Sequence, residues 1–432
     1  MLQGQRMYSL CKEIFPFCRS ITGEGVRETL TVLQNHLCLS KEINFNILSI
    51  PSGTEVFDWN VPKEWKIKEA YIEDSSGNHI VDFKNNNLHV LGYSIPVDEW
   101  VDLEELKKHI YTQPDQPYVI PYVTSYYRER YGFCMSEKQK ESLDPGQYHM
   151  FIDSSLFDGC LNYAEVVIPG DTDKEVFFST YICHPSMANN ECSGPVLATE
   201  LINYMCKKKN RKYTYRFVFI PETIGSISYL SIDGNLKHLQ QKMVAGFNLS
   251  CVGDNNDYSI VESIYGNTLA DRVLKNILRF HTNGEYSDYS FLYRGSDERQ
   301  YNAPGINLPV VCFCRSKFGE YPEYHTSADD MSFVSPEGFQ GSYDVMVKTI
   351  EALEYNSFYK VSVLGEPQLG KRGLYPTISQ KGSYDEVLPM KNLIAYSDGN
   401  NDLIDISNLI DVPVDRLIPI IDKLKANKLL ME

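Results

Sequence analysis

The chain has 432 residues, and its 41 Lys and Arg against 57 Asp and Glu give a formal net charge of −16. A length of this order suggests two or three domains, each able to bury a core. The hydrophobic fraction of 43% and the charged fraction of 23% exclude a disordered chain or a coiled rod. The excess of acidic residues opposes nucleic-acid binding by the chain as a whole, because phosphate backbones are also negatively charged.

Neither a targeting signal nor a disulfide framework is expected. No stretch approaches the roughly 18 apolar residues of a membrane span, and the first residues lack the long apolar run of a signal peptide. The 11 cysteines are scattered, which is typical of reduced, buried thiols. We therefore expect a cytoplasmic protein with no membrane partner.

The first 150 residues predict helix and then a small β domain. Residues 5–38 indicate a helix that Pro16 and the turn-rich stretch 19–25 interrupt. Residues 49–149 hold short alternating segments divided by turns, which predict an inserted β-rich domain that ends in an aromatic stretch at 118–131. Some of its aromatics suit either ordinary packing or, if exposed, a lid or dimer contact: Trp59, Trp65, Tyr126 and Tyr127.

From about residue 160, buried apolar runs alternate with helical segments. The expected strands are residues 175–182, 215–220, 244–252 and 306–314. The expected helices are residues 196–208, 224–234, 267–280 and 337–356. This alternation predicts an α/β fold, a mostly parallel sheet flanked by helices, made by residues 1–48 and 150–358 as one discontinuous domain. Active sites of such sheets lie in loops at the carboxyl ends of the strands.

The last part of the chain predicts a separate module. Residues 365–383 have the Pro and Gly content of a linker, and three short amphipathic segments follow within 392–430. Residues 359–432 therefore indicate a linker plus a winged helix-turn-helix-like domain. Its final segment is only mildly basic, with Arg416, Lys423, Lys425 and Lys428 against Asp415 and Asp422. Protein contact or a homo-oligomer is the favoured role, and DNA binding is the alternative.

Polar residues suited to chemistry follow the predicted strands. The first strand leads to His184 and then Glu191, where the dipole of the next helix would keep a carboxylate ionised and able to bind a cation. The second leads to Glu222, a candidate general base, the third to Asp254, and the fourth to His325 in a later loop. Taken singly, each also reads as a capping acid, a turn former or a satisfied histidine. Together, two His and two Glu at one sheet edge predict a catalytic zinc site with N and O ligands.

These residues resemble the zinc aminopeptidase family, exopeptidases with a parallel α/β sheet and normally two zinc ions. The likeness lies in the strand into His184, residues 189–194, 221–226 and 248–253, and His325. More closely, the chain resembles bacterial aminopeptidase-like proteins with a nested β domain and a C-terminal winged helix, often labelled polysaccharide-biosynthesis proteins. Residues 19–27, 183–194, 295–301 and 323–326 carry that likeness. The resemblance covers essentially the whole chain and implies a zinc exopeptidase-like fold with an inserted β domain and a C-terminal winged helix.

The departures from the family pattern imply one zinc ion rather than two. Asn190, Thr223 and Ser250 fall where the family has carboxylate ligands. Neutral donors do not balance the charge of two Zn²⁺ ions. Asn190 and Asp254 remain candidates for supporting the ligands or holding a secondary metal.

The remaining residues would rebuild a site for one zinc. The resemblance implies His184, Glu191 and His325 as its ligands. Glu222 would be the base for a zinc-activated water, whose pKa falls to about 7.

The polar loop 296–301 and Tyr324 offer candidates for substrate binding. Arg299 could pair with a substrate carboxylate, as in a carboxypeptidase, or Asp297 or Glu298 could hold a free amine, as in an aminopeptidase. The charges of residues 297–299 could equally pair with one another at the surface. Tyr324 could donate to the oxyanion of a tetrahedral intermediate, or simply pack.

Two functions follow from these patterns. The leading one is a mononuclear zinc-dependent exopeptidase or amidohydrolase that cleaves a small peptide or acylated amine with metal-activated water. The alternative is a catalytically inactive ligand-binding sensor coupled to the C-terminal winged-helix interaction module. Zinc content and the effect of Glu222→Gln on hydrolysis distinguish the two.

Overall fold

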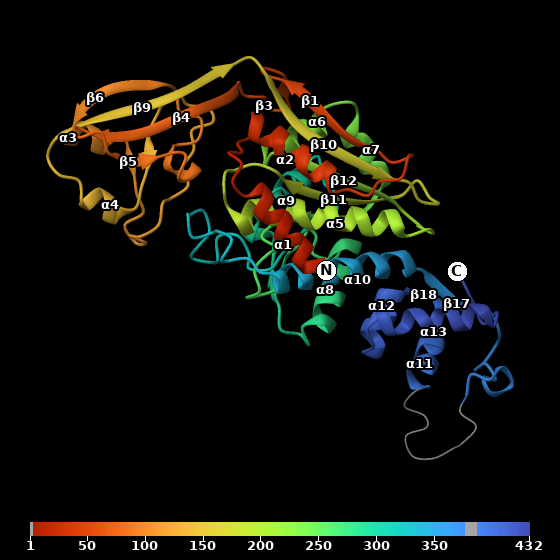
Figure 1. Ribbon diagram of the computed structural model, residues 1–432. Helices are drawn as coiled ribbons and strands as arrows, with labels where there is room; N and C mark the ends of the chain where they lie inside the picture. The colour runs from red at the N-terminus through yellow and green to blue at the C-terminus, as the bar shows by residue number, and fades with distance from the viewer. Residues whose placement is uncertain (1–2, 376–386) are drawn as a thin grey trace. The chain divides into compact units, whose positions relative to one another are not determined.

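The computed structural model describes residues 3–375 and 387–432 and is drawn in Figure 1. The chain divides into two compact units. Unit 1 comprises residues 1–266 and 287–343, and unit 2 comprises residues 267–286 and 344–432. No helix in the described ranges is both long and apolar enough to cross a membrane.

Unit 1 is built on a sheet that has eight strands in the described part of the chain, in the order β1-β10-β12-β11-β13-β16-β14-β15. The bounds are β1 Phe45–Pro51, β10 Cys160–Ile168, β11 Glu175–Tyr181, β12 Thr214–Ile220, β13 Met243–Leu249, β14 Ser259–Val261, β15 Ser287–Tyr289 and β16 Val310–Cys314. The central strands β12, β11, β13 and β16 run parallel, whereas β10 and β14 join them antiparallel. All seven residues of β11 are buried, as expected for a strand covered on both faces. The predicted mostly parallel α/β sheet is confirmed.

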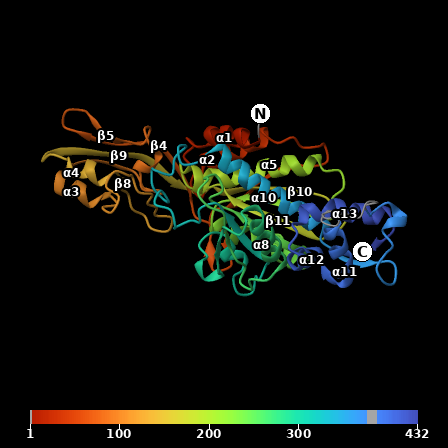
Figure 2. The ribbon, with the colours of Figure 1, turned by 90° about the horizontal axis from the view of Figure 1, so that it is seen from below.

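Helices cover both faces of this sheet (Figures 1 and 2). They are α1 Gln3–Ile14, α2 Glu24–Asn35, α5 Ser193–Lys207, α6 Ile224–Ser231, α7 Asn235–Lys242 and α9 Glu298–Tyr301. Phe177 and Tyr181 of β11 pack in one apolar cluster with Ile227 of α6. Side chains alternate along a strand, so Thr180 faces the opposite layer. There α5 packs against β11, and a Cβ added to Gly194 would lie 2.3 Å from Thr180 Oγ1, so only glycine fits at that contact.

The predicted interruption of residues 5–38 is present and separates α1 from α2. A buried side chain holds the turn between them. The Arg19 guanidinium donates to the carbonyl of Ile14 at the end of α1 and to Cys192 Sγ, 3.0 Å away. Strands β1, β10, β14 and β15 were not predicted, and β14 and β15 have only three residues each, too few to show a pattern.

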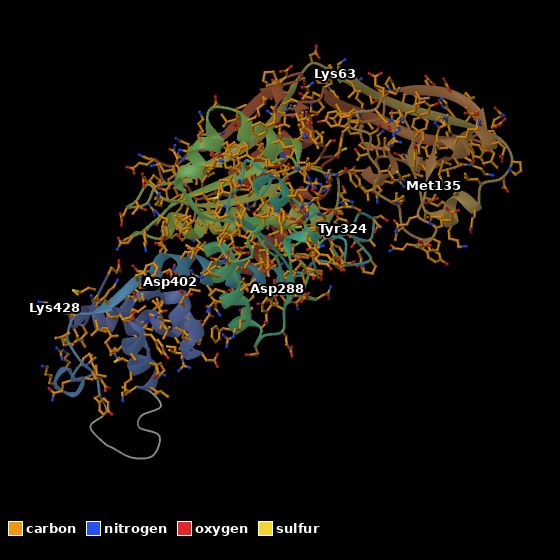
Figure 3. All side chains as sticks on the ribbon, turned by 180° about the vertical axis from the view of Figure 1, so that it is seen from behind. Lys63, Met135, Asp288, Tyr324, Asp402 and Lys428 are labelled. Atoms are coloured by element: carbon orange, nitrogen blue, oxygen red, sulfur yellow. The ribbon has the colours of Figure 1, made fainter. Side chains whose placement is uncertain are left out.

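The inserted region forms its own β module within unit 1, drawn in orange in Figure 1. In the described residues its main sheet has the antiparallel order β5-β4-β9-β6. The bounds are β2 Glu55–Val56, β3 Trp59–Asn60, β4 Glu64–Asp74, β5 His79–Asp82, β6 Val97–Asp102, α3 Leu103–Lys108, β7 Ile110–Tyr111, β8 Phe133–Cys134, α4 Glu137–Glu141 and β9 Gln147–Phe157. Ile72, Met135 and Met150 belong to its own apolar core, and Met135 is marked in Figure 3. The module therefore carries its own core beside the central sheet.

Unit 2 contains the C-terminal helices and a small antiparallel sheet of order β18-β17-β19. The bounds are α8 Leu269–His281, α10 Pro336–Tyr355 (which begins in unit 1), β17 Phe358–Val361, α11 Leu388–Tyr396, β18 Asp398–Asp402, α12 Leu403–Ile410, α13 Val414–Ala426 and β19 Leu430–Met431. Arg272 of α8 pairs with Asp402 at the start of α12, marked in Figure 3. Three helices beside a small sheet are the arrangement predicted for a winged helix. Of the expected linker 365–383, residues 376–383 lie outside the described residues.

Candidate functional site

The central strands of unit 1 deliver their polar residues to one edge. β11 leads to Cys183 and His184, β12 leads to Glu222, and the long loop after β16 leads to His325. Because these strands are parallel, the residues that follow them share the carboxyl edge of the sheet, where ligands bind in such folds.

Strained backbone follows each of the central strands at this edge. His184, Thr223, Cys251 and His325 have φ angles of 58°, 62°, 53° and 56°, in the left-handed region that residues with a Cβ rarely adopt. Each such residue costs about 1–3 kcal/mol, so the surrounding structure has to hold it. Thr223 shows how, because its N–H donates to Asp297 Oδ1 at 2.7 Å. Strained residues after each of the central strands are typical of a functional site.

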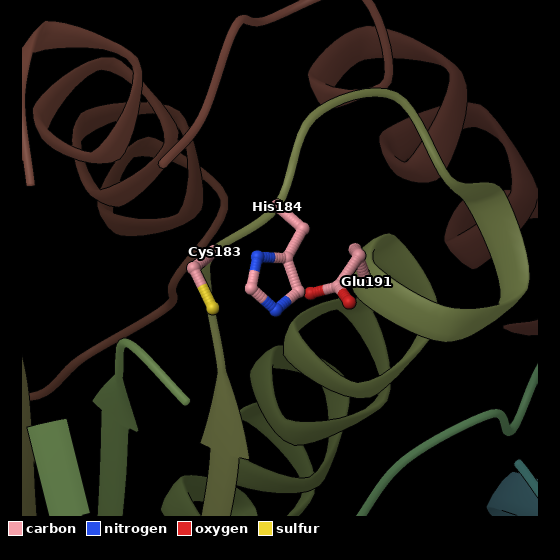
Figure 4. Close-up of side chains that lie close together, drawn as sticks. All are labelled: Cys183, His184 and Glu191. Carbon is pink, nitrogen blue, oxygen red and sulfur yellow. The ribbon is translucent and has the colours of Figure 1, made fainter. Parts of the chain in front are cut away.

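Three buried side chains meet there with the chemistry of a metal site. Cys183, His184 and Glu191 each offer a ligand atom, and these atoms lie within 4.8 Å of one another. Figure 4 shows Cys183 and His184 extending from the end of β11 and Glu191 from the turn before α5. Cys183 Sγ also accepts the backbone N–H of Glu222 at 3.0 Å. In the part of the chain that the structure describes, this is the one group of three or more such residues.

Of these three residues, Glu191 has the most unusual environment. It lies in a π-helical turn, Ala188–Cys192, and is 1% exposed, yet neither carboxylate oxygen has a hydrogen-bond partner. Burial, and then the charge of Glu222, raise the pKa of Glu191 well above its usual value. Burial thus opposes the ionised form that we expected for this carboxylate from its place before a helix. Buried polar atoms are almost always partnered, so the two unpartnered oxygens mark Glu191 as a candidate ligand for a cation.

His184 is held through both ring nitrogens. Its Nδ1 lies 2.6 Å from the hydroxyl of Tyr122 and 2.8 Å from that of Tyr126, and its Nε2 lies 3.0 Å from Glu222 Oε2. Since an ionised carboxylate only accepts, the Nε2 nitrogen donates to Glu222. Both tyrosines come from the inserted region, so that region takes part in the site.

Glu222 is an ionised carboxylate that faces a cavity. Burial pushes the pKa of Glu222 up, but the hydrogen bond from His184 and the charges of His184 and Arg299 hold it below its usual value. Arg299 Nη2 lies 3.9 Å from Glu222 Oε1 and also donates to Thr223 Oγ1. The proton acceptor Glu222 and the cation Arg299 therefore lie side by side.

His325 reaches the same place but is not a member of the group within 4.8 Å. Its ring stands edge-on to that of His184, with centroids 6.2 Å apart, and burial and His184 lower its pKa to about 4. The backbone N–H of Tyr122 donates to the His325 carbonyl at 2.9 Å, which ties this loop to the inserted region. Tyr324, marked in Figure 3, stacks on the His325 ring with centroids 3.9 Å apart.

A cavity of about 410 Å³ lies here, and we call it the catalytic cavity after the function proposed for it below. Its lining includes the titratable side chains of His184, Glu222, Arg299 and His325 and the aromatic side chains of Trp59, Tyr122, Tyr126 and Tyr127. Of the substrate-binding candidates, Arg299 lines it, whereas Asp297 and Tyr324 are not among the described lining residues. Trp59 is 41% exposed, so it is a cavity wall rather than core packing.

Asp297 lies behind the cavity lining and holds Thr223, one of the lining residues. It is fully buried, and Oδ1 accepts from Thr223 N–H and from Ser226 Oγ at 3.1 Å, while Oδ2 has no partner. Burial and the charge of Glu222 raise the pKa of Asp297 to about 8. This contact set fits a residue that holds the strained Thr223 rather than a substrate amine.

Asn190 and Asp254 also face protein groups. Asn190 Nδ2 donates to the Tyr181 hydroxyl at 2.7 Å, while its Oδ1 is buried without a partner. Asp254 accepts from Asn189 Nδ2 at 3.0 Å and from Ser316 Oγ at 2.8 Å. Asp254 therefore braces the turn that carries Glu191.

Three residues of the site were missed by sequence reasoning. Cys183 stands beside His184, and Tyr122 lies in the aromatic stretch noted at 118–131, so both had a weak local signal. Asp329 had none, although it organises the Glu191 turn: its Oδ1 and Oδ2 accept the N–H groups of Asn189 and Asn190 at 2.6 and 3.0 Å.

The fold and the residues at its strand ends define an aminopeptidase-like α/β domain joined to a winged helix. Over residues 8–356 the chain matches the family described as domain of unknown function DUF4910, and it belongs to that family. Residues 357–432 match the winged helix-turn-helix family, which confirms the predicted C-terminal module.

Relatives with names or solved structures agree with this assignment. A Clostridium acetobutylicum protein named "Putative polysaccharide biosynthesis protein with aminopeptidase-like domain" is 42% identical over 407 residues, 94% of this chain and 91% of that one. A crystal structure of a "putative peptidase" from the same species gives a TM-score of 0.90 at 40% identity, over 99% of this chain and 96% of that chain. The zinc aminopeptidase BSAP of Bacillus subtilis gives 0.58 at 13% identity, over 81% and 94%, and so shares the fold alone. The predicted family and fold are confirmed.

Proposed function

We propose that the chain is a hydrolase of peptide or amide bonds that uses one zinc ion held by His184 and Glu191, with either Cys183 or His325 as the third ligand. The observation that carries this proposal is Glu191, a buried carboxyl with two unpartnered oxygens beside His184 and the catalytic cavity. A cation would satisfy both oxygens and lower the cost of burying them. The relative named as a peptidase supports the same class of reaction.

The donor set fits one ion rather than two. Asn190, Thr223 and Ser250 are neutral, and Ser250 Oγ is already hydrogen-bonded to the Tyr181 hydroxyl. His184 can release its Nε2 to a metal, because a hydroxyl both donates and accepts and can then receive a proton from Nδ1. When bound, zinc would supply the Lewis acidity that polarises a carbonyl and acidifies water.

The chain's own groups provide the remaining chemistry. Glu222, ionised and in the cavity, accepts the proton of the attacking water and passes it to the leaving amine. Tyr122 and Tyr126 fix the His184 ring, and Arg299 offers a cation for a substrate carboxylate. The 11 cysteines are all free thiols, which supports a reducing compartment such as the cytoplasm.

Metal analysis and a single variant test this proposal. Protein purified without added zinc is expected to hold about one zinc per chain, and His184→Ala is expected to lose it. Glu222→Gln should keep the metal but lose hydrolysis of blocked dipeptides and acylated amino acids, whereas Glu320→Gln at the surface should keep both. Full turnover in Glu222→Gln removes Glu222 from the mechanism. A metal-free chain that binds ligands without cleaving them supports the sensor instead.

A further inference from the structure

A second cavity of unit 1 adjoins the catalytic cavity and has no role in the reaction described so far. It has a volume of about 690 Å³ and lies between the turn after β14, the 3₁₀ turn Phe291–Tyr293 and the loop after α9. Arg299 lines both cavities, so its side chain forms a shared wall. A ligand in one cavity can therefore extend past Arg299 into the other.

The walls of this second cavity are apolar and exposed. We call it the apolar groove and define it by Ile264, Tyr265, Phe291, Leu292, Ala303 and Pro304. Ile264, Tyr265 and Leu292 are 42%, 64% and 82% exposed. Apolar side chains gathered around a concave surface in this way mark a binding site.

Hydrogen bonds within the chain hold the walls of the apolar groove in place without a ligand. Asn302 is fully buried, and its Oδ1 accepts the N–H of Ile264 at 3.0 Å. Its Nδ2 donates to the carbonyls of Glu298 and Val310 at 2.8 and 2.7 Å. One side chain thus ties the turn after β14 to α9 and to the central sheet.

The charges around the groove favour an anionic ligand. Arg294 and Arg299 both line it, and the Arg294 guanidinium lies 4.9 Å from the centre of the Phe291 ring. Glu262 is the carboxylate among the lining residues. Two guanidinium groups beside an apolar surface suit a ligand that carries a carboxylate next to a large apolar group.

We propose that the apolar groove binds the side chain of a large apolar residue at the C-terminal end of the substrate. That residue's free carboxylate pairs with Arg299, and the amide bond before it lies in the catalytic cavity. This assignment rests on the proposed hydrolase function. Water adds to the amide carbonyl carbon, the C–N bond breaks, Glu222 passes the water's proton to the amine, and a carboxylic acid and a free apolar amino acid are released.

Binding measured apart from turnover tests the groove. The probes are N-acetyl-phenylalanine, N-acetyl-glycine and N-acetyl-phenylalanine amide, titrated by calorimetry into zinc-loaded Glu222→Gln protein. The phenylalanine probe should bind about 10-fold more tightly than the glycine probe, because it buries a large apolar side chain. It should also bind about 10-fold more tightly than its amide, which lacks the carboxylate for Arg299.

A groove variant gives the control. Leu292→Asn should abolish most of the preference for phenylalanine over glycine without unfolding the chain, since Leu292 is largely exposed. Leu364→Asn, a fully exposed leucine of unit 2, should leave that preference unchanged. Equal affinity for the phenylalanine and glycine probes refutes the proposed role of the apolar groove, even if the chain cleaves amides. A phenylalanine preference in a wild-type chain that cleaves no amide supports the groove and refutes the hydrolase.

Discussion

Replacing Glu191 with glutamine distinguishes a metal ligand from a structural carboxyl. In the metal-free chain the buried carboxyl has a raised pKa, so it stays protonated where the unfolded chain would ionise. Such a group stabilises the fold only below its unfolded pKa, and the free energy of unfolding falls as the pH rises. Glutamine carries no such penalty. Glu191→Gln should therefore leave the metal-free chain as stable as wild type at pH 7, or more stable by about 1–3 kcal/mol, since each pH unit between the ordinary carboxyl pKa and pH 7 is worth up to about 1.4 kcal/mol.

Zinc should reverse the order of the two proteins. A ligand at 100 times its Kd stabilises the folded state by about 2.7 kcal/mol. Wild type should gain this amount, whereas Glu191→Gln, which lacks a carboxylate ligand, should gain almost nothing. The same substitution thus raises or preserves stability without metal and removes the response to metal.

Urea denaturation with a chelator and with zinc measures both effects. Glu298→Gln is the matched control, because Glu298 is equally buried but accepts the N–H groups of Gly295 and Ser296 at 2.8 and 3.2 Å. Burial raises the pKa of Glu298 as well, and an amide oxygen can still accept both N–H groups, so Glu298→Gln should stay close to wild type without metal and keep the response to zinc. The reasoning fails if Glu191→Gln is less stable than wild type without metal, or if zinc stabilises it as much as wild type.

Three further predictions concern the surroundings of the site. Removing both hydroxyls in Tyr122→Phe with Tyr126→Phe should weaken zinc binding about 10- to 100-fold in a chelator competition, because His184 Nδ1 loses its partners. Tyr127→Phe, whose hydroxyl donates to the backbone instead, should bind zinc as wild type does. Asp329→Asn places an amide NH₂ against a backbone N–H, so urea denaturation should show a loss of about 1–3 kcal/mol, and an unchanged midpoint would contradict that role. Folding raises the pKa of Asp297 from 3.8 to about 8, so between these pH values the free energy of unfolding should fall as the pH rises. Asp297→Asn should flatten that slope, and an identical slope would exclude Asp297 as its source.

Much of the fold could be predicted because its signals are local. A run such as residues 175–182, apolar and bounded by turns, identifies a buried strand without knowledge of its neighbours. The same pattern locates His184 and Glu222 just after strands, which is enough to place them at one sheet edge.

The parts that escaped prediction depend on distant partners. The contact between Tyr122 and His184 joins positions 62 residues apart, and it crosses from the inserted region to the central sheet. The protonation of Glu191 is set by the residues that bury it, whereas its position before a helix indicated the opposite. The sequence pattern near a residue indicates its secondary structure. The charge state of its side chain depends on the buried residues that pack around it in the fold.

The link between Asp329 and the Glu191 turn bears on how this protein is made. The hydrogen bond to Asn189 spans 140 residues, so a ribosome completes the whole central sheet before that turn is secured. A nascent chain released early would carry His184 and Glu191 without the brace that aligns them. Binding of the proposed zinc ion would then follow the folding of the central sheet rather than guide it.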